Sequence, residues 1–280
     1  MYWGYSTVDV FRAFILGIVQ GLAEPLPISS SGHLILVPWL LGWPEHSLTF
    51  DVALHGGTAL AIIVYFWRDW IALIGGFFAG LRDRDFKSSY YRRLSIYIIV
   101  SSVPGAVAGV LFEQKIESLL RTPLLVATLL IVMGLVMMAV DRYASRTRSL
   151  GDLTIWDAII IGLAQAFALA PGVSRSGVTI TTALMLQMNR ADAARFSFLM
   201  SGPIVTGAFL YKMYGVAKEG FPVDERAPFL VGTAVAAVVG YVAIRFLLGY
   251  LQKRSLKLFV GYRLAFGALV IGTIVLRGGA

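Results

Sequence analysis

The chain has 280 residues, of which 58% are hydrophobic and 14% are charged, and its formal net charge at pH 7 is +8. Soluble domains carry about 25% charged residues, so this composition excludes an ordinary soluble fold and favours a bundle of membrane helices. The positive residues lie between apolar runs and form no basic stripe, which argues against nucleic-acid binding. The absence of Cys excludes disulfides, thiolate metal sites and a cysteine nucleophile.

A helix needs roughly 20 mostly apolar residues to cross a membrane. In chain order, the runs that meet or approach this length are 50–67, 94–112, 123–140, 196–213, 228–250 and 256–276. The N-terminus lacks the basic start and small-residue cleavage site of a signal peptide, so we expect the first helix to remain in the mature protein. Segment 70–81 is apolar but too short to span, and we expect it at the cytoplasmic interface.

Regions 8–43 and 155–188 differ from these simple runs. Each contains an apolar helix pattern, then a break rich in Pro, Gly and Ser, then another short apolar run. We interpret both as re-entrant hairpins, because non-helical backbone at membrane depth needs surrounding protein or a water-filled cavity. Two extra pairs of short spanning helices are the alternative. The predicted fold is an all-α polytopic integral membrane protein with about six transmembrane helices and two re-entrant helix–break–helix hairpins.

The two breaks also align with each other without gaps, 17–35 over 162–180, at a constant offset of 145. The identical pairs are Gly17/Gly162, Gln20/Gln165, Ala23/Ala168, Ser29/Ser174, Ser31/Ser176, Gly32/Gly177 and Ile35/Ile180. Three expected spans separate the hairpins, so the second half should be inverted relative to the first. We therefore predict one membrane domain, 1–280, with inverted repeats 8–141 and 153–277 and a site where they meet near the midplane. Chance similarity between small-residue breaks is the alternative.

Most Lys and Arg residues lie in four segments between the apolar runs: 68–93, 142–149, 189–195 and 252–257. Cytoplasmic loops of membrane proteins are enriched in these residues, so we expect these segments on the cytoplasmic side and both termini outside. Arg245 and Arg263 lie within apolar spans, and we expect them to snorkel to the interface. His46 and His55 are interpreted as structural or interfacial.

The first break carries Glu24, the one acidic residue that follows a fully apolar helix turn within a hairpin. A charge at that depth costs at least about 2.5 kcal/mol, so it usually has a partner or a function. Gln20 shares its helix face. Pro25 and Pro27 should end the helix at Glu24, because proline cannot continue the hydrogen-bond ladder and disfavours helix in the residue before it.

Three serines and a histidine follow: Ser29, Ser30, Ser31 and His33. Serines can cap the next helix, which is the simpler reading for Ser29. If helix resumes near Ser29, Ser30 and His33 face the same way. A carboxylate, hydroxyls and an imidazole within one break favour chemistry over a purely structural role.

The second break offers an anion site. Backbone amides at the start of a helix attract phosphate, and arginine can clamp phosphate oxygens in a bidentate manner. The candidate residues are Gly172, Ser174, Arg175, Ser176 and Gly177. The alternative for Arg175 is an ion pair with Glu24 that holds the hairpins together. Inverted symmetry should bring the two breaks together, which indicates phosphoryl transfer from an anionic lipid to water.

At these residues the sequence resembles the bacterial undecaprenyl-diphosphatase family, also called bacitracin-resistance proteins. The first family motif matches Gln20, Glu24, Pro27, Ser29, Ser30 and His33, and the second, Pro-Gly-x-Ser-Arg-Ser-Gly, matches 171–177. FDVALHGGT at 50–58 and FSF at 196–198 are also similar, and the likeness covers nearly the whole chain. Pro25 stands where the family usually has Phe, which leaves the exact end of the first helix open.

The resemblance implies hydrolysis of undecaprenyl diphosphate to the monophosphate, which recycles the lipid carrier for cell-wall synthesis and confers bacitracin resistance. It also implies a multi-pass protein of the bacterial inner membrane whose site faces the periplasm, and a divalent cation, Mg²⁺ or Ca²⁺, at the carboxylate motif. Undecaprenyl diphosphate and membrane lipids are the expected partners, and a homodimer stays open.

In the mechanism we expect, Arg175 and the amides of 174–177 hold the diphosphate, with Ser29 and Ser31 as further hydroxyl donors. The cation joins the diphosphate to Glu24, with Gln20 beside it. Ser30 or a water attacks, and His33 takes the proton.

A transporter or flippase for anions or lipids is the rival, because inverted repeats and broken helices are its architecture too. A lipid phosphatase of the Pro-Ser-Gly-His type is a second rival, but its Lys-x6-Arg-Pro motif does not appear. A structural membrane subunit is the third, and it would not require Glu24.

Overall fold

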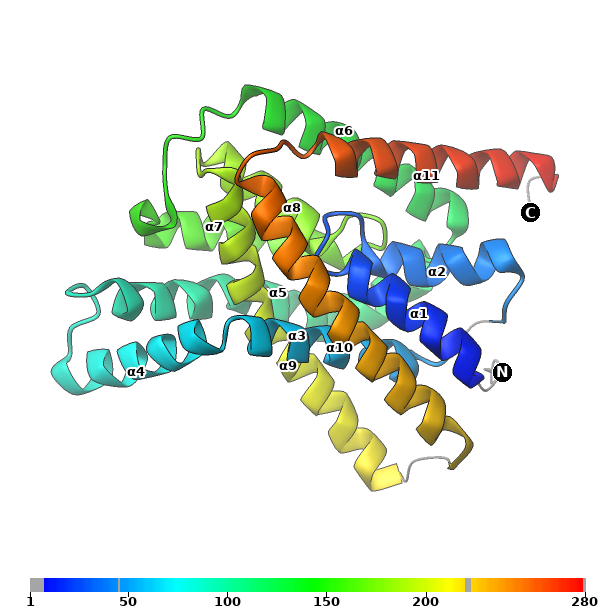
Figure 1. Ribbon diagram of the computed structural model, residues 1–280, viewed down its shortest axis with the longest axis horizontal. Coiled ribbons are helices and arrows are strands. Elements are labelled where there is room, and N and C mark those ends of the chain that lie inside the picture. Colours follow the sequence, from blue (N-terminus) through cyan, green and yellow to red (C-terminus); the bar gives the residue numbers. More distant parts are fainter. Residues whose placement is uncertain (1–7, 45, 220–222, 279–280) are drawn as a thin grey trace.

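The computed structural model describes residues 8–44, 46–219 and 223–278, and all regular elements within them are helices (Figure 1). Two of them, η1 and η2, are single 3-10 turns. The bounds are α1 Val10–Ala23, α2 Ser30–Leu41, α3 Leu48–Tyr65, α4 Trp67–Asp83, α5 Tyr90–Leu120, α6 Pro123–Tyr143, η1 Leu150–Asp152, α7 Ile155–Ala166, η2 Phe167–Leu169, α8 Arg175–Met185, α9 Arg190–Glu219, α10 Val223–Leu251 and α11 Lys257–Leu276.

Five described helices, α5, α6, α9, α10 and α11, are long and apolar enough to cross a membrane. They contain the predicted spans 94–112, 123–140, 196–213 and 228–250 whole, and 256–276 but for its first residue. The sixth predicted span, 50–67, falls on α3, which joins α4 at a bend of 78°. Segment 70–81 lies inside α4. The chain is therefore an all-α polytopic membrane protein, as predicted.

The two predicted hairpins are α1–α2 and α7–α8, each with a short non-helical break. The first helix of each hairpin packs against the other half of the chain, α1 along α10 and α7 along α5. Small residues permit this close approach. A Cβ atom on Gly17 would lie 2.8 Å from the Gly232 carbonyl oxygen, and one on Gly162 would lie 2.6 Å from that of Ser101. Because the first helix of each hairpin packs against the opposite half of the chain, both breaks lie in the middle of the bundle.

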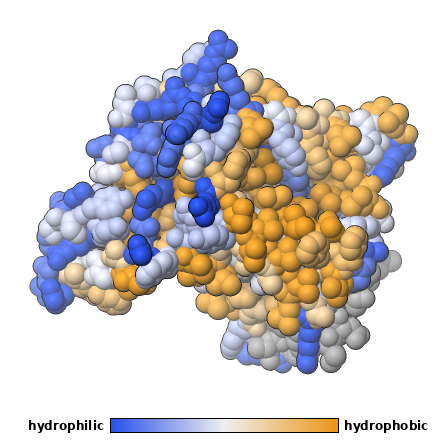
Figure 2. Space-filling model, viewed as in Figure 1, coloured by the Kyte–Doolittle hydropathy of each residue, from blue (hydrophilic) through white to orange (hydrophobic). Residues whose placement is uncertain are grey.

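Three of the basic segments lie at one end of the molecule, on the left of Figure 1, where Figure 2 also shows most of the hydrophilic surface. Polar contacts link segments 142–149, 189–195 and 252–257 to the end of α6 and the start of α7. Asp141 at the end of α6 accepts from Arg190 Nε at 2.5 Å and from the Leu256 amide at 3.1 Å. Arg148 pairs with Asp157 at 2.5 Å. The centre of Figure 2 is mostly apolar, as expected of a surface that faces lipid.

Candidate active site

The two breaks share one backbone geometry. Ser29 and Ser174 each precede a helix with φ of 77° and 76°, values that residues other than glycine rarely adopt. Each hydroxyl caps its helix, Ser29 Oγ accepting from the Gly32 amide at 3.3 Å and Ser174 Oγ from the Gly177 amide at 3.1 Å. The capping prediction for Ser29 is confirmed. Equal strain at equivalent positions indicates a functional constraint on both breaks.

Direct hydrogen bonds join one break to the other. The Gly172 amide donates to Ser29 Oγ at 3.1 Å. Ser176 Oγ lies 3.3 Å from the Glu24 carbonyl oxygen and 3.2 Å from that of Leu26. Sequence segments about 150 residues apart thus form one site, as the inverted-repeat argument predicts.

Glu24 is the centre of this site. It caps the C-terminus of α1, which confirms the predicted helix end. Arg175 Nη2 donates to Oε1, which confirms the ion pair weighed as an alternative. Ser30 Oγ donates to Oε2 at 2.5 Å, and Gln20 Nε2 donates to it at 3.2 Å. The carboxylate side chain is only 6% exposed, so Arg175 supplies the countercharge that its burial requires.

His33 lies elsewhere. Its Nδ1 is 2.7 Å from the Ser29 carbonyl oxygen and its Nε2 is 2.7 Å from the Tyr262 hydroxyl, while its ring stacks on Phe266 at 4.6 Å. A carbonyl only accepts, so Nδ1 must donate, and in the neutral ring Nε2 accepts from Tyr262. Both nitrogens are engaged away from Ser30. The structure therefore does not bring His33 to Ser30 as the sequence reading expected.

His55 is the residue that sequence reasoning missed. It projects from α3 with Nδ1 2.7 Å from the Asp51 carbonyl oxygen and Nε2 3.4 Å from Glu24 Oε2. The sequence interpretation of His55 as structural or interfacial did not foresee this position, beside Glu24 and in the cavity lining. A polar residue within the apolar run 50–67 was the available signal. His46 pairs with Asp51 at 2.6 Å, which fits its structural reading.

Arg263 corrects a second expectation, because it does not snorkel. Its side chain is fully buried, and it donates only to backbone oxygens. Nη1 lies 3.1 Å from the Pro27 oxygen, and Nη2 lies 2.6 Å from that of Gly172 and 3.3 Å from that of Val173. Nε donates to the Leu130 oxygen at 3.0 Å. Arg263 therefore links both breaks to α6 through these hydrogen bonds.

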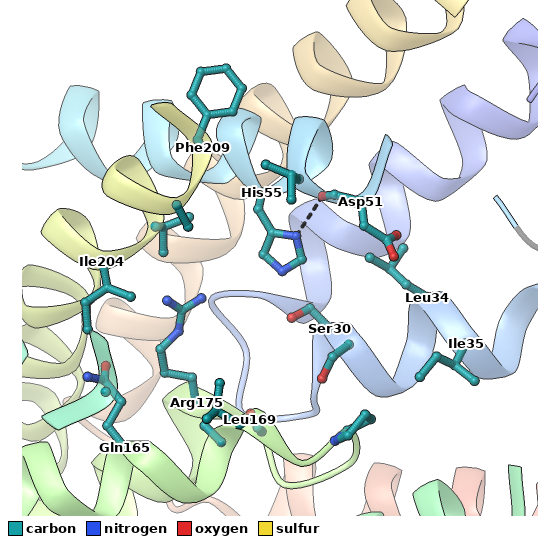
Figure 3. A pocket seen from close by; sticks show the side chains of 18 of the residues that line it. Ser30, Leu34, Ile35, Asp51, His55, Gln165, Leu169, Arg175, Ile204 and Phe209 are labelled. Carbon is teal, nitrogen blue, oxygen red and sulfur yellow. Dashed lines mark hydrogen bonds between the residues drawn. The ribbon is translucent and has the colours of Figure 1, made fainter. Parts of the chain in front are cut away.

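A cavity of about 300 Å³ opens in front of this cluster (Figure 3). Its polar lining includes Ser30, Ser31, His55, Ser174 and Arg175. Its apolar lining includes Leu34, Ile35, Leu169, Ile204, Val205 and Phe209. The other predicted phosphate-binding residues, Ser29, Gly172, Ser176 and Gly177, are absent from this lining and instead make the contacts that hold the breaks. The arrangement suits a small anionic group attached to an apolar chain.

Few of the described residues in the site are available to bind a cation. No group of three or more His, Cys, Asp or Glu able to hold a metal exists in the described part of the chain. Glu24 supplies one carboxylate, and Gln20 Oε1 is a buried acceptor with no hydrogen-bond partner within the described residues. Mg²⁺ is commonly bound by one or two carboxylates plus substrate phosphates, whereas Ca²⁺ takes six to eight oxygens. A single carboxylate and one amide oxygen therefore fit Mg²⁺ better than Ca²⁺.

Comparison with known proteins gives one consistent result. Residues 13–269 match the family described as bacitracin resistance protein BacA. A Geotalea daltonii protein named undecaprenyl-diphosphatase is 52% identical over 265 residues, which cover 94% of this chain and 98% of that protein. A protein of the same name from Moorella thermoacetica is 49% identical over 271 residues, covering 96% of this chain and 100% of that protein.

Proposed function

This chain belongs to the bacitracin resistance protein BacA family, and we propose that it is an undecaprenyl-diphosphatase. It hydrolyses undecaprenyl diphosphate to undecaprenyl phosphate and inorganic phosphate. This reaction recycles the lipid carrier for cell-wall polymer synthesis and confers resistance to bacitracin. The observation that carries the proposal is the cluster of Glu24, Ser30 and Arg175, which both breaks build at an apolar-walled cavity.

Arg175 serves as the phosphate clamp. Its guanidinium is occupied by Glu24 here and also lines the cavity, so a diphosphate that enters competes with the carboxylate for it. A planar guanidinium can bind two phosphate oxygens at once and neutralises charge that develops during phosphoryl transfer. Ser31 and Ser174 are the further cavity-lining donors.

Ser30 is the nucleophile in this proposal. Its hydroxyl already donates to Glu24 Oε2 at 2.5 Å, so the carboxylate is placed to accept the proton as Oγ attacks the terminal phosphorus. The Oγ–P bond forms while the anhydride P–O bond breaks, and the lipid monophosphate leaves. Water then hydrolyses the phosphoserine. A water activated by the same carboxylate is the alternative nucleophile, and trapping of phospho-Ser30 distinguishes the two.

His55 replaces His33 as the histidine of the site, and it exchanges with Glu24 the proton that the carboxylate takes from Ser30. Its Nδ1 donates to the Asp51 carbonyl, which leaves Nε2 facing Glu24 to receive or return a proton. A divalent cation held by Glu24 and Gln20, when bound, neutralises phosphate charge. His33 instead orients Ser29 and thereby the start of α2.

The transporter reading is not favoured. A carrier has little need for a hydroxyl that donates directly to a buried carboxylate. The direct test of the phosphatase is release of inorganic phosphate from undecaprenyl diphosphate by the purified protein in detergent, with and without EDTA. We expect release that EDTA abolishes and excess Mg²⁺ restores.

We further propose that the protein lies in the bacterial inner membrane with the cavity open to the periplasm. Three of the basic segments lie at the left end of the bundle in Figure 1, whereas α2, which contributes Ser30, Ser31, Leu34 and Ile35 to the cavity lining, lies on the right. The chain has no Cys, so single-cysteine variants label cleanly. In intact cells with a permeable outer membrane, a membrane-impermeant maleimide should label Lys218→Cys but label Lys87→Cys only after lysis. Labelling of Lys87→Cys alone in intact cells would reverse the orientation.

A further inference from the structure

Gln165 is a buried polar residue that the proposed mechanism does not use. It lies in the last turn of α7, its side chain is almost fully buried, and it lines the same cavity as Arg175. Neither its Oε1 nor its Nε2 hydrogen-bonds to any other group in the described residues. A buried amide without partners is costly, so its retention at a cavity wall calls for a ligand.

Gln20, the equivalent residue in the first half of the chain, makes the side-chain hydrogen bonds that Gln165 lacks. Gln20 Nε2 donates to Glu24 at 3.2 Å and to the Thr58 hydroxyl at 3.4 Å. The position four residues after Gln165 is Leu169, whose side chain cannot accept a hydrogen bond. The second repeat therefore keeps the glutamine without the carboxylate that engages its counterpart.

The position of Gln165 in the cavity indicates which part of a diphosphate it would meet. In Figure 3, Arg175 lies between Ser30 and Gln165, and Ile204 lies on the side of Gln165. The terminal phosphorus must lie against Ser30 if that hydroxyl attacks it. A diphosphate held across Arg175 then places its other phosphate, the one attached to the isoprenoid, towards Gln165 and the apolar wall.

We propose that Gln165 is a substrate-binding residue whose Nε2 donates a hydrogen bond to the phosphate that remains on the lipid. This inference rests on the proposed phosphatase function and deepens it. Gln165 thereby distinguishes lipid-linked phosphate from free phosphate, because inorganic phosphate needs only the subsite at Ser30 and Arg175.

Gly105 on α5 supplies a means of moving this amide without removing it. A Cβ atom at Gly105 would lie 2.6 Å from Gln165 Nε2, so Gly105→Ala must displace the amide. Gly109, one turn further along the same helix, has no atom within 4 Å of the equivalent position. Gly109→Ala is therefore the matched control, with the same change in helix propensity and no steric contact.

The experiment measures competitive inhibition of farnesyl diphosphate hydrolysis by two probes, farnesyl monophosphate and inorganic phosphate. Hydrogen bonds to charged groups are among the stronger ones, so Gln165→Ala and Gly105→Ala should raise the Ki of farnesyl monophosphate roughly 10-fold or more. The Ki of inorganic phosphate should change less than about twofold, and Gly109→Ala should match wild type in both.

An unchanged Ki for farnesyl monophosphate in both variants would overturn the assignment, as would equal rises for both probes, which a merely structural role produces. Gly105→Ala retains the glutamine and so keeps the test decisive if Gln165→Ala fails to fold. An active wild type with unchanged Ki values removes only the role of Gln165. A folded wild type that releases no phosphate removes the proposed function and this inference together.

Discussion

Replacing Arg175 with alanine is expected to lower kcat/KM for undecaprenyl diphosphate by roughly 10³-fold, the upper end of the effect of removing one electrostatic donor from a reacting centre. Arg175 is the cation that the structure places both in the cavity lining and on Glu24. Arg175→Lys keeps the charge but loses the planar fork, so its kcat/KM should lie between those of wild type and the alanine variant. Steady-state phosphate release measures both.

Two controls separate chemistry from folding in that experiment. Arg92 forms a surface ion pair with Asp83 at 2.6 Å, away from the cavity, and Arg92→Ala should stay within about twofold of wild type. The double change Glu24→Gln with Arg175→Met removes both buried charges, so it should fold better than either single variant and remain inactive. Near-wild-type turnover by a folded Arg175→Ala protein would refute the clamp.

Replacing Arg263 with methionine is expected to lower the free energy of unfolding by about 3–5 kcal/mol, because buried acceptors on three separate segments lose their donor together. These acceptors are the carbonyls of Pro27, Leu130, Gly172 and Val173. Activity should fall with stability, since both breaks lose their common support. Thermal unfolding of the purified protein in detergent measures the loss.

Arg245→Met is the matched control for that change. Arg245 also lies in an apolar span, on α10, but its side chain is exposed. Its replacement should change stability by no more than about 0.5 kcal/mol. Equal small losses in the two variants would show that the Arg263 contacts are dispensable.

The sequence predicted those features that local chemistry determines. Pro25 and Pro27 end α1 at Glu24 because proline breaks the hydrogen-bond ladder, and Ser29 begins α2 because its hydroxyl caps the first turn. The ion pair between Glu24 and Arg175 could also be predicted from the sequence. It followed from the internal repeat, which places two segments far apart in sequence at one midplane site.

The features that were missed depend on contacts between distant helices. His33 looked like the partner of Ser30 from its spacing, but Tyr262 on α11 draws its Nε2 away. The position of His55 could not be predicted because the sequence does not show that α3 packs beside the first break, which places His55 against Glu24. Arg263 looked like an interfacial arginine because nothing in the sequence of α11 shows that four carbonyls from other segments surround it. Helix periodicity predicts which faces are apolar, and it does not specify these pairings.

The most direct test of this account is phosphate release from undecaprenyl diphosphate by purified, folded protein, with wild type measured beside Ser30→Ala and Glu24→Gln. We expect Mg²⁺-dependent release by wild type and loss of roughly 10³-fold or more in both variants, because each loses part of the contact between the Ser30 hydroxyl and the Glu24 carboxylate. Ser29→Ala should lose far less, since Ser29 only holds the breaks. Unimpaired release by either Ser30→Ala or Glu24→Gln would contradict the assigned chemistry, and no release by wild type would contradict the enzyme itself.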